Sequence, residues 1–296
     1  MATGVTTLTG FNENPYISVA EYKDAPTSID YDNLVVGGNA NAQDAELARV
    51  ILRATSYLNE YLNQDLVASL TTETQRVRLN TQGFIALHPN INPVLSLNAF
   101  NYGPTPNNLV ALPDPSVCWF ENQQIIIPLS QVALTYSSQG PLSFGGGAPG
   151  QPIYAQYTYV GGYVNTRTTA NATLGATSIT VADASGIIPG EVYRIIDGAS
   201  SETVTISSSY TYGSTTVTLA SALTFAHTAG ATLSNLPFVI KEATIIMTTV
   251  FLKVRGDNSM TMNITTAPTA NIPGSMRYGN EVQMALDMVS KYRRIR

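Results

Sequence analysis

Residues 41–64, NAQDAELARVILRATSYLNEYLNQ, carry the clearest structural pattern in the sequence. Apolar residues recur there at intervals of four, three, four and three positions, which places them on one stripe of an α-helix. The stripe consists of Leu47, Ile51, Ala54, Leu58 and Tyr61. Asn41, followed by Asp44, resembles a capping box, and Glu46 suits the positive end of the helix dipole. The pattern predicts a helix over residues 42–63 whose apolar stripe requires partners from elsewhere in the chain.

Two further helices are predicted near the end of the chain, over residues 238–254 and 279–294. The first, FVIKEATIIMTTVFLKVR, is followed by Gly256, a residue type that commonly ends helices. The second has one apolar face. That face consists of Val282, Leu286, Val289 and Tyr292. Because neither helix has another obvious partner, we expect both to pack on the first helix.

The segments between the helices are typical of β-strands. Residues 74–103 and 117–163 hold short apolar runs separated by Gly, Pro and Asn, which predict strands joined by turns. The run VCWFENQQIIIP predicts a hairpin that turns near Glu121 and Asn122. The composition then shifts to Thr, Ser, Ala and Gly, with four β-branched runs between turn residues. Residues 166–236 are therefore expected to form a compact β module.

The order of these elements predicts an α+β fold with a discontinuous first domain. Residues 16–165 and 237–296 together form a small helical bundle with accessory β-strands and hairpins. Residues 166–236 are inserted into it as an all-β domain, a small barrel or sandwich. Residues 1–15 have neither the basic segment nor the apolar run of a secretory signal, which favours an N-terminal arm.

The chain of 296 residues is acidic except at its end. It carries 15 Lys and Arg against 20 Asp and Glu, yet four of the cations lie in the last six residues, KYRRIR. Residues 1–290 therefore hold 11 Lys and Arg against 20 Asp and Glu, a formal charge of −9. An acidic body repels nucleic acid, which argues against a nucleic-acid-binding protein. The basic end has two interpretations, as a cap worth ~0.3–1 kcal/mol per charge at the negative end of the last helix, or as a docking site for a protein.

Composition also limits how the fold is held together. The single cysteine, Cys118, excludes an internal disulfide, so packing must stabilise the fold, and the chain is compatible with a reducing cytosol. The most apolar segment, residues 238–254, is interrupted by Lys241 and Glu242. Its longest uncharged run spans roughly 14 Å of helix against a hydrocarbon layer of ~30 Å, which favours a buried helix over a membrane span.

Motifs for nucleotide binding and nucleophilic catalysis are weak. Residues 145–150 match a dinucleotide-binding spacing, but they contain Pro149 and precede no helix that could hold a pyrophosphate, so a loop is preferred. Cys118 adjoins Trp119 in an apolar strand, where a buried thiol is a better interpretation than a nucleophile paired with His88.

Metal sites are equally weak. His88 and His227 lie 139 positions apart in different predicted domains, which favours structural roles for both. Asp197 and Glu202 could bind calcium, although such residues occupy turns for backbone reasons far more often. We therefore expect no catalytic residues, no cofactor and no metal, and a structural or binding role.

The order of segments along the chain, rather than a catalytic motif, is similar to a known family. YISVAEYKDAPTSIDYDNL, QDAELARVILRATSYLNEYLNQDL, the strand-rich residues 71–104 and YAQYTYVGGYVNT resemble the head-to-tail connector (adaptor) proteins of long-tailed bacteriophages. EATIIMTTVFLKVRG and NEVQMALDMVSKYRRIR resemble the closing helices of that family. Residues 166–236 resemble a β insertion carried by a subset of such phage proteins, and they depart from the minimal family pattern.

The resemblance implies a structural virion protein without enzymatic activity. Helices 42–63, 238–254 and 279–294 would form the core of a subunit that assembles into a ring, typically of twelve copies, below the portal protein of the head. The ring would extend the DNA channel, let genomic DNA pass without specific binding, and receive a stopper or tail-completion protein. It would lie in the neck of the virion after assembly in the host cytoplasm, without membrane contact, and the β insertion is expected on its outside.

On the same resemblance, the basic end becomes a candidate for docking to the portal. The candidate residues are Lys291, Tyr292, Arg293, Arg294, Ile295 and Arg296. Exposed ion pairs contribute only about 0–1 kcal/mol each, but repetition around a ring gains roughly 10² to 10⁴ in avidity.

Two other functions remain open from the sequence. The Thr-rich module at residues 166–236, with Tyr210 and Tyr212, is compatible with adhesion or carbohydrate binding. A hydrolase built on Cys118 and His88 is the third hypothesis.

Overall fold

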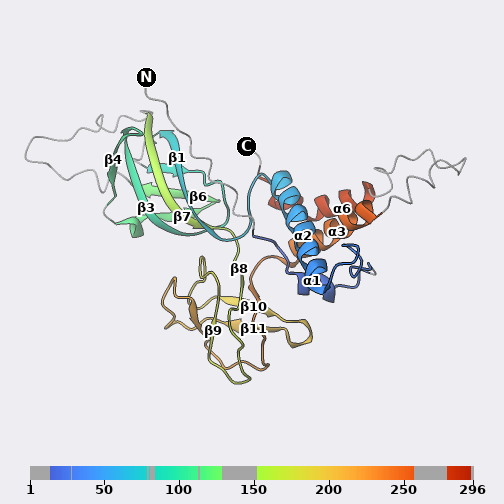
Figure 1. The fold of residues 1–296 in the computed structure, drawn as a ribbon. Coiled ribbons are helices and arrows are strands. Elements are labelled where there is room, and N and C mark those ends of the chain that lie inside the picture. The colour runs from blue at the N-terminus through green and yellow to red at the C-terminus, as the bar shows by residue number, and fades with distance from the viewer. Residues whose placement is uncertain are drawn as a thin grey trace, which may run out of the picture.

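The computed structural model of the chain describes residues 14–27, 29–78, 80, 84–112, 114–128, 152–256 and 279–294. The chain has an α+β fold, as the sequence predicts, and Figure 1 shows it as three parts. A helical unit contains both the early and the late helices, a β-sandwich contains strands β1–β7, and a β module contains strands β8–β13. The N-terminal arm, apart from Asn14 and Pro15, and the Gly-rich residues 145–150 lie outside the described residues.

The helical unit brings the first and the last helices of the chain together. It consists of α1 (Val19–Asp24), α2 (Ala40–Leu62), α3 (Phe238–Gly256) and α6 (Gly279–Val289). Its core combines Leu58 of α2, Met247 of α3 and Val289 of α6, all fully buried. The prediction that the two late helices pack on the first is therefore confirmed, and each fully buried large apolar side chain contributes about 1.5–3 kcal/mol.

Two helix ends differ from the sequence-based prediction. The N-cap of α2 is Asn39, whose side chain accepts a hydrogen bond from the Ala42 amide at 3.0 Å, and not Asn41, which lies inside the helix. The spacing of Asn41 and Asp44 resembles a capping box but places the N-cap two residues too late. At the other end of the chain, α6 stops at Val289 and a short 3₁₀ helix follows, η5 (Ser290–Tyr292). The predicted α-helix over residues 279–294 is therefore too long.

The β-sandwich consists of two sheets that face one core. One sheet has the strand order β1-β7-β3-β4 and the other has the order β2-β6-β5. The strands are β1 (Ser69–Arg78), β2 (Phe84–Leu87), β3 (Val94–Thr105), β4 (Asn108–Ala111), β5 (Trp119–Glu121), β6 (Gln124–Pro128) and β7 (Pro152–Gly161), with a 3₁₀ turn, η1 (Pro115–Val117), before β5. Buried side chains from both sheets, including Ile85, Phe100, Ile127 and Tyr157, form one cluster. These strands were predicted as accessories of the bundle, yet they have a core of their own.

The β module consists of short antiparallel strands around another core. Its strands are β8 (Asn165–Arg167), β9 (Ser178–Thr180), β10 (Val192–Ile196), β11 (Glu202–Thr205), β12 (Thr216–Thr218) and β13 (Thr232–Ser234), with a 3₁₀ turn, η4 (Gly198–Ser200). Four of them pair in the order β11-β10-β13-β8, and β12 pairs with β9. Ile187, Ile195, Val217 and Leu233 are buried at the centre of this cluster.

The β module packs directly on the β-sandwich. Leu95 of β3 lies against the core cluster of the module, and a Cβ atom added to Gly186 would lie only 2.6 Å from the Leu95 side chain. Gly186 also has a φ of +81°, which favours glycine. A hydrogen bond of 3.0 Å between the Ser96 and Tyr212 hydroxyls adds a polar contact nearby.

None of the helices in the described part of the chain is long and apolar enough to cross a membrane.

Candidate functional site

The C-terminal segment, residues 290–294, runs back across the end of α2. The amide of Arg294 donates a hydrogen bond to the carbonyl of Leu62, the last residue of α2, at 2.9 Å. The side chain of Asn63 donates to the Arg294 carbonyl at 3.3 Å, and that of Gln64 donates to the Tyr292 carbonyl at 2.6 Å. The last carbonyls of a helix lack partners within it. The C-terminal segment therefore caps α2 as well as ending α6.

The side chain of Arg294 extends the segment to the β-sandwich. Its guanidinium donates to the His88 carbonyl at 3.0 Å and to the side chain of Asn90, both in the loop between β2 and β3. The Arg293 guanidinium lies 5.0 Å from the centroid of the Tyr61 ring of α2. Two of the candidate docking cations, Arg293 and Arg294, thus make contacts within the chain. We call these two residues the clasp, because they connect the helical unit with the β-sandwich.

The remaining candidate docking residues differ in position. Lys291 is exposed and its ammonium lies 4.8 Å from the centroid of the Tyr292 ring. Tyr292 packs edge to face against Tyr163, with centroids 6.4 Å apart. Ile295 and Arg296 lie outside the described residues. The cations at positions 293 and 294 follow the 3₁₀ turn, so they are not in the last turn of α6.

A polar cluster under the clasp orders the edge of the β-sandwich. The Glu73 carboxylate of β1 accepts hydrogen bonds from the hydroxyls of Tyr157 and Tyr159 on β7, at 3.0 and 2.5 Å, and from the Asn90 amide at 2.8 Å. Burial, and then the negative charge of Glu73, raise the pKa of both tyrosines, whereas the nearby Arg294 guanidinium lowers it. Arg294 of the clasp and Glu73 thus act on the same two tyrosines with opposite signs.

A buried ammonium joins the helical unit to the start of the β module. Lys241 of α3 is 4% exposed, and its three N–H groups have three acceptors. They are the Glu21 carboxylate at 2.7 Å, the Tyr16 carbonyl at 3.2 Å and the Asn165 side-chain oxygen at 3.2 Å. Burial lowers the pKa of Lys241, and the Glu21 carboxylate opposes that shift. The interruption of the apolar helix at Lys241, seen in the sequence, is thus an anchor for α1 and β8.

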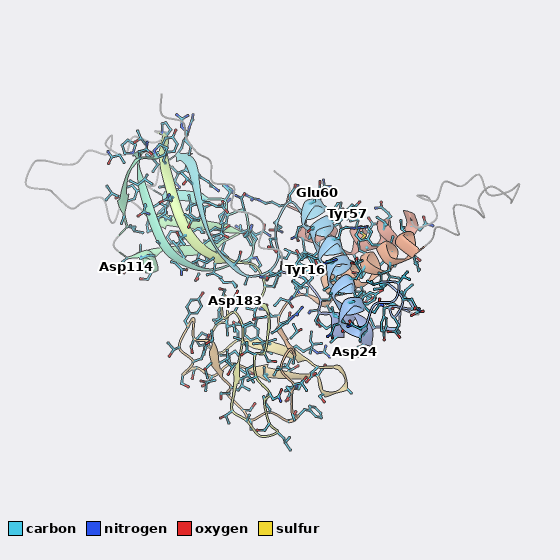
Figure 2. All side chains as sticks on the ribbon, in the orientation of Figure 1. Tyr16, Asp24, Tyr57, Glu60, Asp114 and Asp183 are labelled. Atoms are coloured by element: carbon cyan, nitrogen blue, oxygen red, sulfur yellow. The ribbon has the colours of Figure 1, made fainter. Side chains whose placement is uncertain are left out.

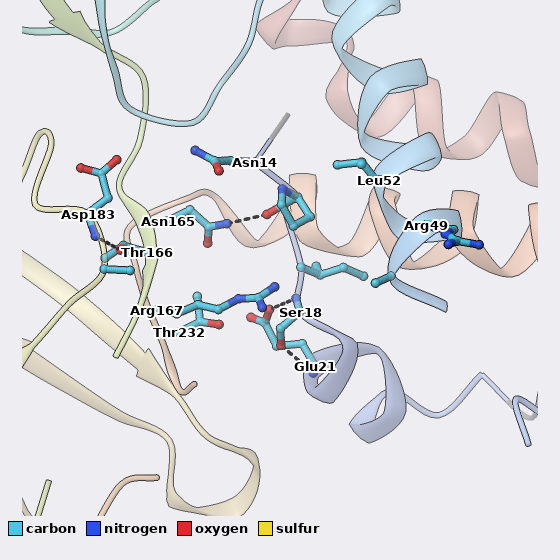
Figure 3. A pocket seen from close by; sticks show the side chains of 14 residues that line it. Asn14, Ser18, Glu21, Arg49, Leu52, Asn165, Thr166, Arg167, Asp183 and Thr232 are labelled. Atoms are coloured by element: carbon cyan, nitrogen blue, oxygen red, sulfur yellow. Dashed lines mark hydrogen bonds between the residues drawn. The ribbon is translucent and has the colours of Figure 1, made fainter. Parts of the chain in front are cut away.

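Two pockets lie on either side of the segment from Ile17 to Glu21, each with a volume of ≈ 500 Å³. We call the first the arginine pocket, because Arg49 and Arg167 line it together with the apolar side chains of Ile17 and Leu52. Figure 3 shows the Arg167 side chain directed toward α1. We call the second the acidic pocket. Its walls include Asp24, Glu242 and the ion pair of Glu21 with Lys241.

The β module contains a histidine cluster that the sequence analysis did not recognise. The ring of His227 is 2% exposed and lies between two carboxylates, with Nδ1 3.2 Å from Asp197 and Nε2 2.8 Å from Glu202. Burial raises the pKa of Glu202, but hydrogen bonds from Thr224, His227 and the Phe225 amide outweigh it and lower the pKa to about 2.

This cluster serves the loops of the module. Asp197 also accepts a hydrogen bond from the Thr228 amide at 3.1 Å, and Glu202 accepts one from the Thr224 amide at 2.9 Å. The carboxylates considered for calcium are therefore bound to protein donors. Across the residues that the structure describes, no group of three or more His, Cys, Asp and Glu side chains is arranged to hold a metal ion. Asp197 and Glu202 lie 30 and 25 positions before His227 in the sequence. Such separations give no local pattern, so the sequence did not predict the cluster.

The residues considered for hydrolysis do not form a nucleophile pair. Cys118 is partly buried beside η1, where burial and then the Asp114 charge raise the pKa of its thiol to about 11. A thiol with this pKa is protonated at neutral pH and is a poor nucleophile. His88 is exposed at the other end of the clasp, where its backbone bonds Gln75 and Arg294.

The tyrosines considered for sugar binding are engaged in the fold. Tyr210 is 5% exposed and donates a hydrogen bond to the Ser214 carbonyl at 2.7 Å. Tyr212 is 43% exposed, and its hydroxyl bonds Ser96 of the β-sandwich. Both side chains thus stabilise the module and its contact with β3.

Comparisons with known proteins give a distant structural similarity. No protein-family model and no curated protein matches the sequence. Among solved structures, the chain is similar to a chain of the neck of an empty GTA particle, computed with C6 symmetry. The two chains are 10% identical, and the match covers 96% of this chain and 95% of the other, with a TM-score of 0.36.

Proposed function

We propose that the chain is a structural, non-enzymatic subunit of a virion neck. In this proposal it is a head-to-tail connector that assembles into a ring below the portal, extends the DNA channel and receives a stopper or tail-completion protein. The proposal is supported by the resemblance of the sequence segments to the connector family, together with the way these segments fold.

One structural observation carries the proposal. The three helices that the resemblance assigns to the core of a connector share one cluster of buried side chains, to which Tyr16 near the start and Val289 near the end both contribute. The β-sandwich and the β module project from this helical unit (Figure 1). A closed helical core with projecting β units suits a subunit that contacts neighbours on several sides. The acidic body, at −9 over residues 1–290, suits a channel through which DNA slides without being gripped.

Binding to the portal tests the proposal. Full-length protein is mixed with portal rings of the same virus, sedimented through a gradient, and viewed by negative-stain microscopy. The proposal expects a second ring stacked on the portal. A folded chain that never associates with portal particles would contradict it.

The same assay tests the C-terminal docking residues. In our proposal the exposed Lys291 contacts the portal, while Arg293 and Arg294 form the clasp. Lys291→Glu should then weaken portal binding without lowering thermal stability, because its side chain is exposed. Undiminished binding of Lys291→Glu would remove this residue from the docking site.

A further inference from the structure

The hairpin of β5 and β6 exposes aromatic and acidic side chains at one end of the β-sandwich. Val117, Trp119 and Phe120 are 36%, 39% and 46% exposed, and all three residues of β5 are exposed. Asp114 and Glu121, also exposed, flank them. We call residues 114–123 the aromatic tip. Single exposed apolar side chains are normal on a protein surface, but a cluster on a projecting hairpin marks a contact with a partner.

The aromatic tip is preformed. Asn122 and Gln123, at the turn, have φ values of 50° and 63°, the combination that a type I′ hairpin turn requires. The rings of Trp119 and Phe84 pack edge to face, with centroids 5.4 Å apart. In the described sheet β5 is an edge strand, with β6 as its neighbour. An exposed apolar edge strand invites pairing with another chain, so it needs a partner that covers it.

The arginine pocket complements this tip. The pocket has a volume of ≈ 500 Å³, and part of its wall is apolar, including Ile17 and Leu52. An apolar wall suits an inserted aromatic ring. Arg167 is exposed in its wall, and within the described part of the chain its side chain has no ion pair. The buried ammonium of Lys241 lies close enough for the two positive charges to repel each other. Glu21 pairs with Lys241, so Arg167 is the cation of the pocket that an entering carboxylate could pair with.

The acidic pocket has the same volume but a more negative lining, with three carboxylates and one ammonium against two carboxylates and two guanidinium groups in the arginine pocket. Both pockets share Glu21, but the acidic pocket adds Asp24, Glu242 and Lys241, whereas the arginine pocket adds Asp183 and its two arginines. Glu121 of the tip would be repelled there. Charge therefore selects the arginine pocket as the receptor for an acidic, aromatic hairpin.

The tip and the arginine pocket lie on different parts of the chain. Figure 2 shows Asp114 at the outlying end of the β-sandwich, whereas Asp183, in the pocket wall, lies where the three units meet. A contact between two different surfaces of identical subunits is heterologous, and it produces a closed ring when the rotation between subunits closes.

We propose that the aromatic tip of one copy inserts into the arginine pocket of the next copy, with Glu121 pairing with the neighbour's Arg167 and Trp119 covered by the pocket walls. This contact names the surface through which the ring of the proposed connector forms, and so it rests on the proposed function. The partner is a second copy of this chain.

Trp119, the one tryptophan of the sequence, reports directly on this contact. Its fluorescence emission and its quenching by acrylamide are measured in the full-length protein across a dilution series, with association followed by sedimentation velocity. Association should shift the emission to shorter wavelength and reduce quenching. Rings in which Trp119 is as accessible as in the single subunit would overturn the inference while leaving the connector proposal standing. A chain that neither self-associates nor binds the portal would overturn both.

Charge reversal tests the pairing of Glu121 with Arg167. Arg167→Glu and Glu121→Arg should each raise the concentration needed for association by at least about tenfold, a change of about 1.4 kcal/mol. The double variant should restore association, because the opposite charges face each other again. Failure of the double variant to recover, with circular dichroism showing it folded, would overturn the pairing.

A matched control comes from the β module. Arg194 and Glu191 are also exposed residues of opposite charge on the same part of the chain, but neither lines the arginine pocket. Arg194→Glu changes the net charge by the same amount as Arg167→Glu, and Glu191→Arg by the same amount as Glu121→Arg, and each should leave association and the Trp119 spectrum unchanged. Equal losses in Arg194→Glu and in Arg167→Glu would contradict a specific contact and point to general electrostatics.

Discussion

The Lys241 ammonium holds three segments of the chain at one buried point, and its removal should be costly. Lys241→Met leaves the Glu21 carboxylate buried without its counter-ion, so the free energy of unfolding should fall by about 3–5 kcal/mol. The double variant Lys241→Met, Glu21→Gln should recover most of that loss. Lys253→Met is the control, since its ion pair with Glu281 is about one third exposed and should contribute less than about 1 kcal/mol. Urea unfolding followed by circular dichroism measures all three, and equal losses for Lys241 and Lys253 would contradict the anchor.

Asp65, which follows α2, should make stability depend on pH. It is 6% exposed, and burial raises its pKa from 3.8 to about 6, although hydrogen bonds from the Val67 and Leu66 amides oppose the shift. The folded state then binds more protons than the unfolded state between about pH 4 and 6, so stability falls as pH rises through that window. Asp65→Asn should be neutral at pH 4 and stabilising by about 2 kcal/mol at pH 8. The difference in urea midpoint at the two pH values measures this, and an equal effect at both would exclude the titration.

At the scale of elements, the C-terminal segment is a clasp whose loss should be local. Arg294→Ala removes the side-chain bonds to the loop between β2 and β3, and should lower the free energy of unfolding by about 1 kcal/mol, because such bonds are partly screened by solvent. Hydrogen exchange of residues 88–92 should rise, since the Arg294 side chain holds that loop. The exposed Lys291→Ala is the control. Unchanged exchange in Arg294→Ala would mean that the loop is ordered without the clasp.

The helices could be predicted from the sequence, whereas the clasp could not. Periodicity is a local signal, so α2 and α3 were placed to within a few residues. The contact of Arg294 with His88 joins positions 206 apart, and that of its amide with Leu62 joins positions 232 apart. No spacing in the sequence encodes such pairs. The sequence therefore shows that the end of the chain is basic, but not which residues it contacts.

The β-sandwich illustrates the same limit among strands. Its turns were predicted from Gly, Pro and Asn, including the hairpin at Glu121 and Asn122. The pairing of β1 with β7, in which Ser69 faces Gly161, depends on packing over some 90 positions. Because pairing decides which faces are buried, the separate core of these strands was missed, and so was the role of Glu73 as an acceptor for two tyrosines.

At the scale of the whole molecule, the helical unit combines the first and the last helices, and two β units project from it (Figure 1). The aromatic tip at one end and the arginine pocket at the junction give such a subunit two complementary surfaces. A subunit with two different complementary surfaces has a simple route to a closed ring.

Negative-stain class averages of the purified full-length chain, at a concentration where sedimentation velocity shows one large species, test the central proposal most directly. We expect closed rings with an axial opening and a single copy number, both alone and stacked on portal particles. Single subunits at every concentration, in the absence and in the presence of portal, would contradict the connector proposal.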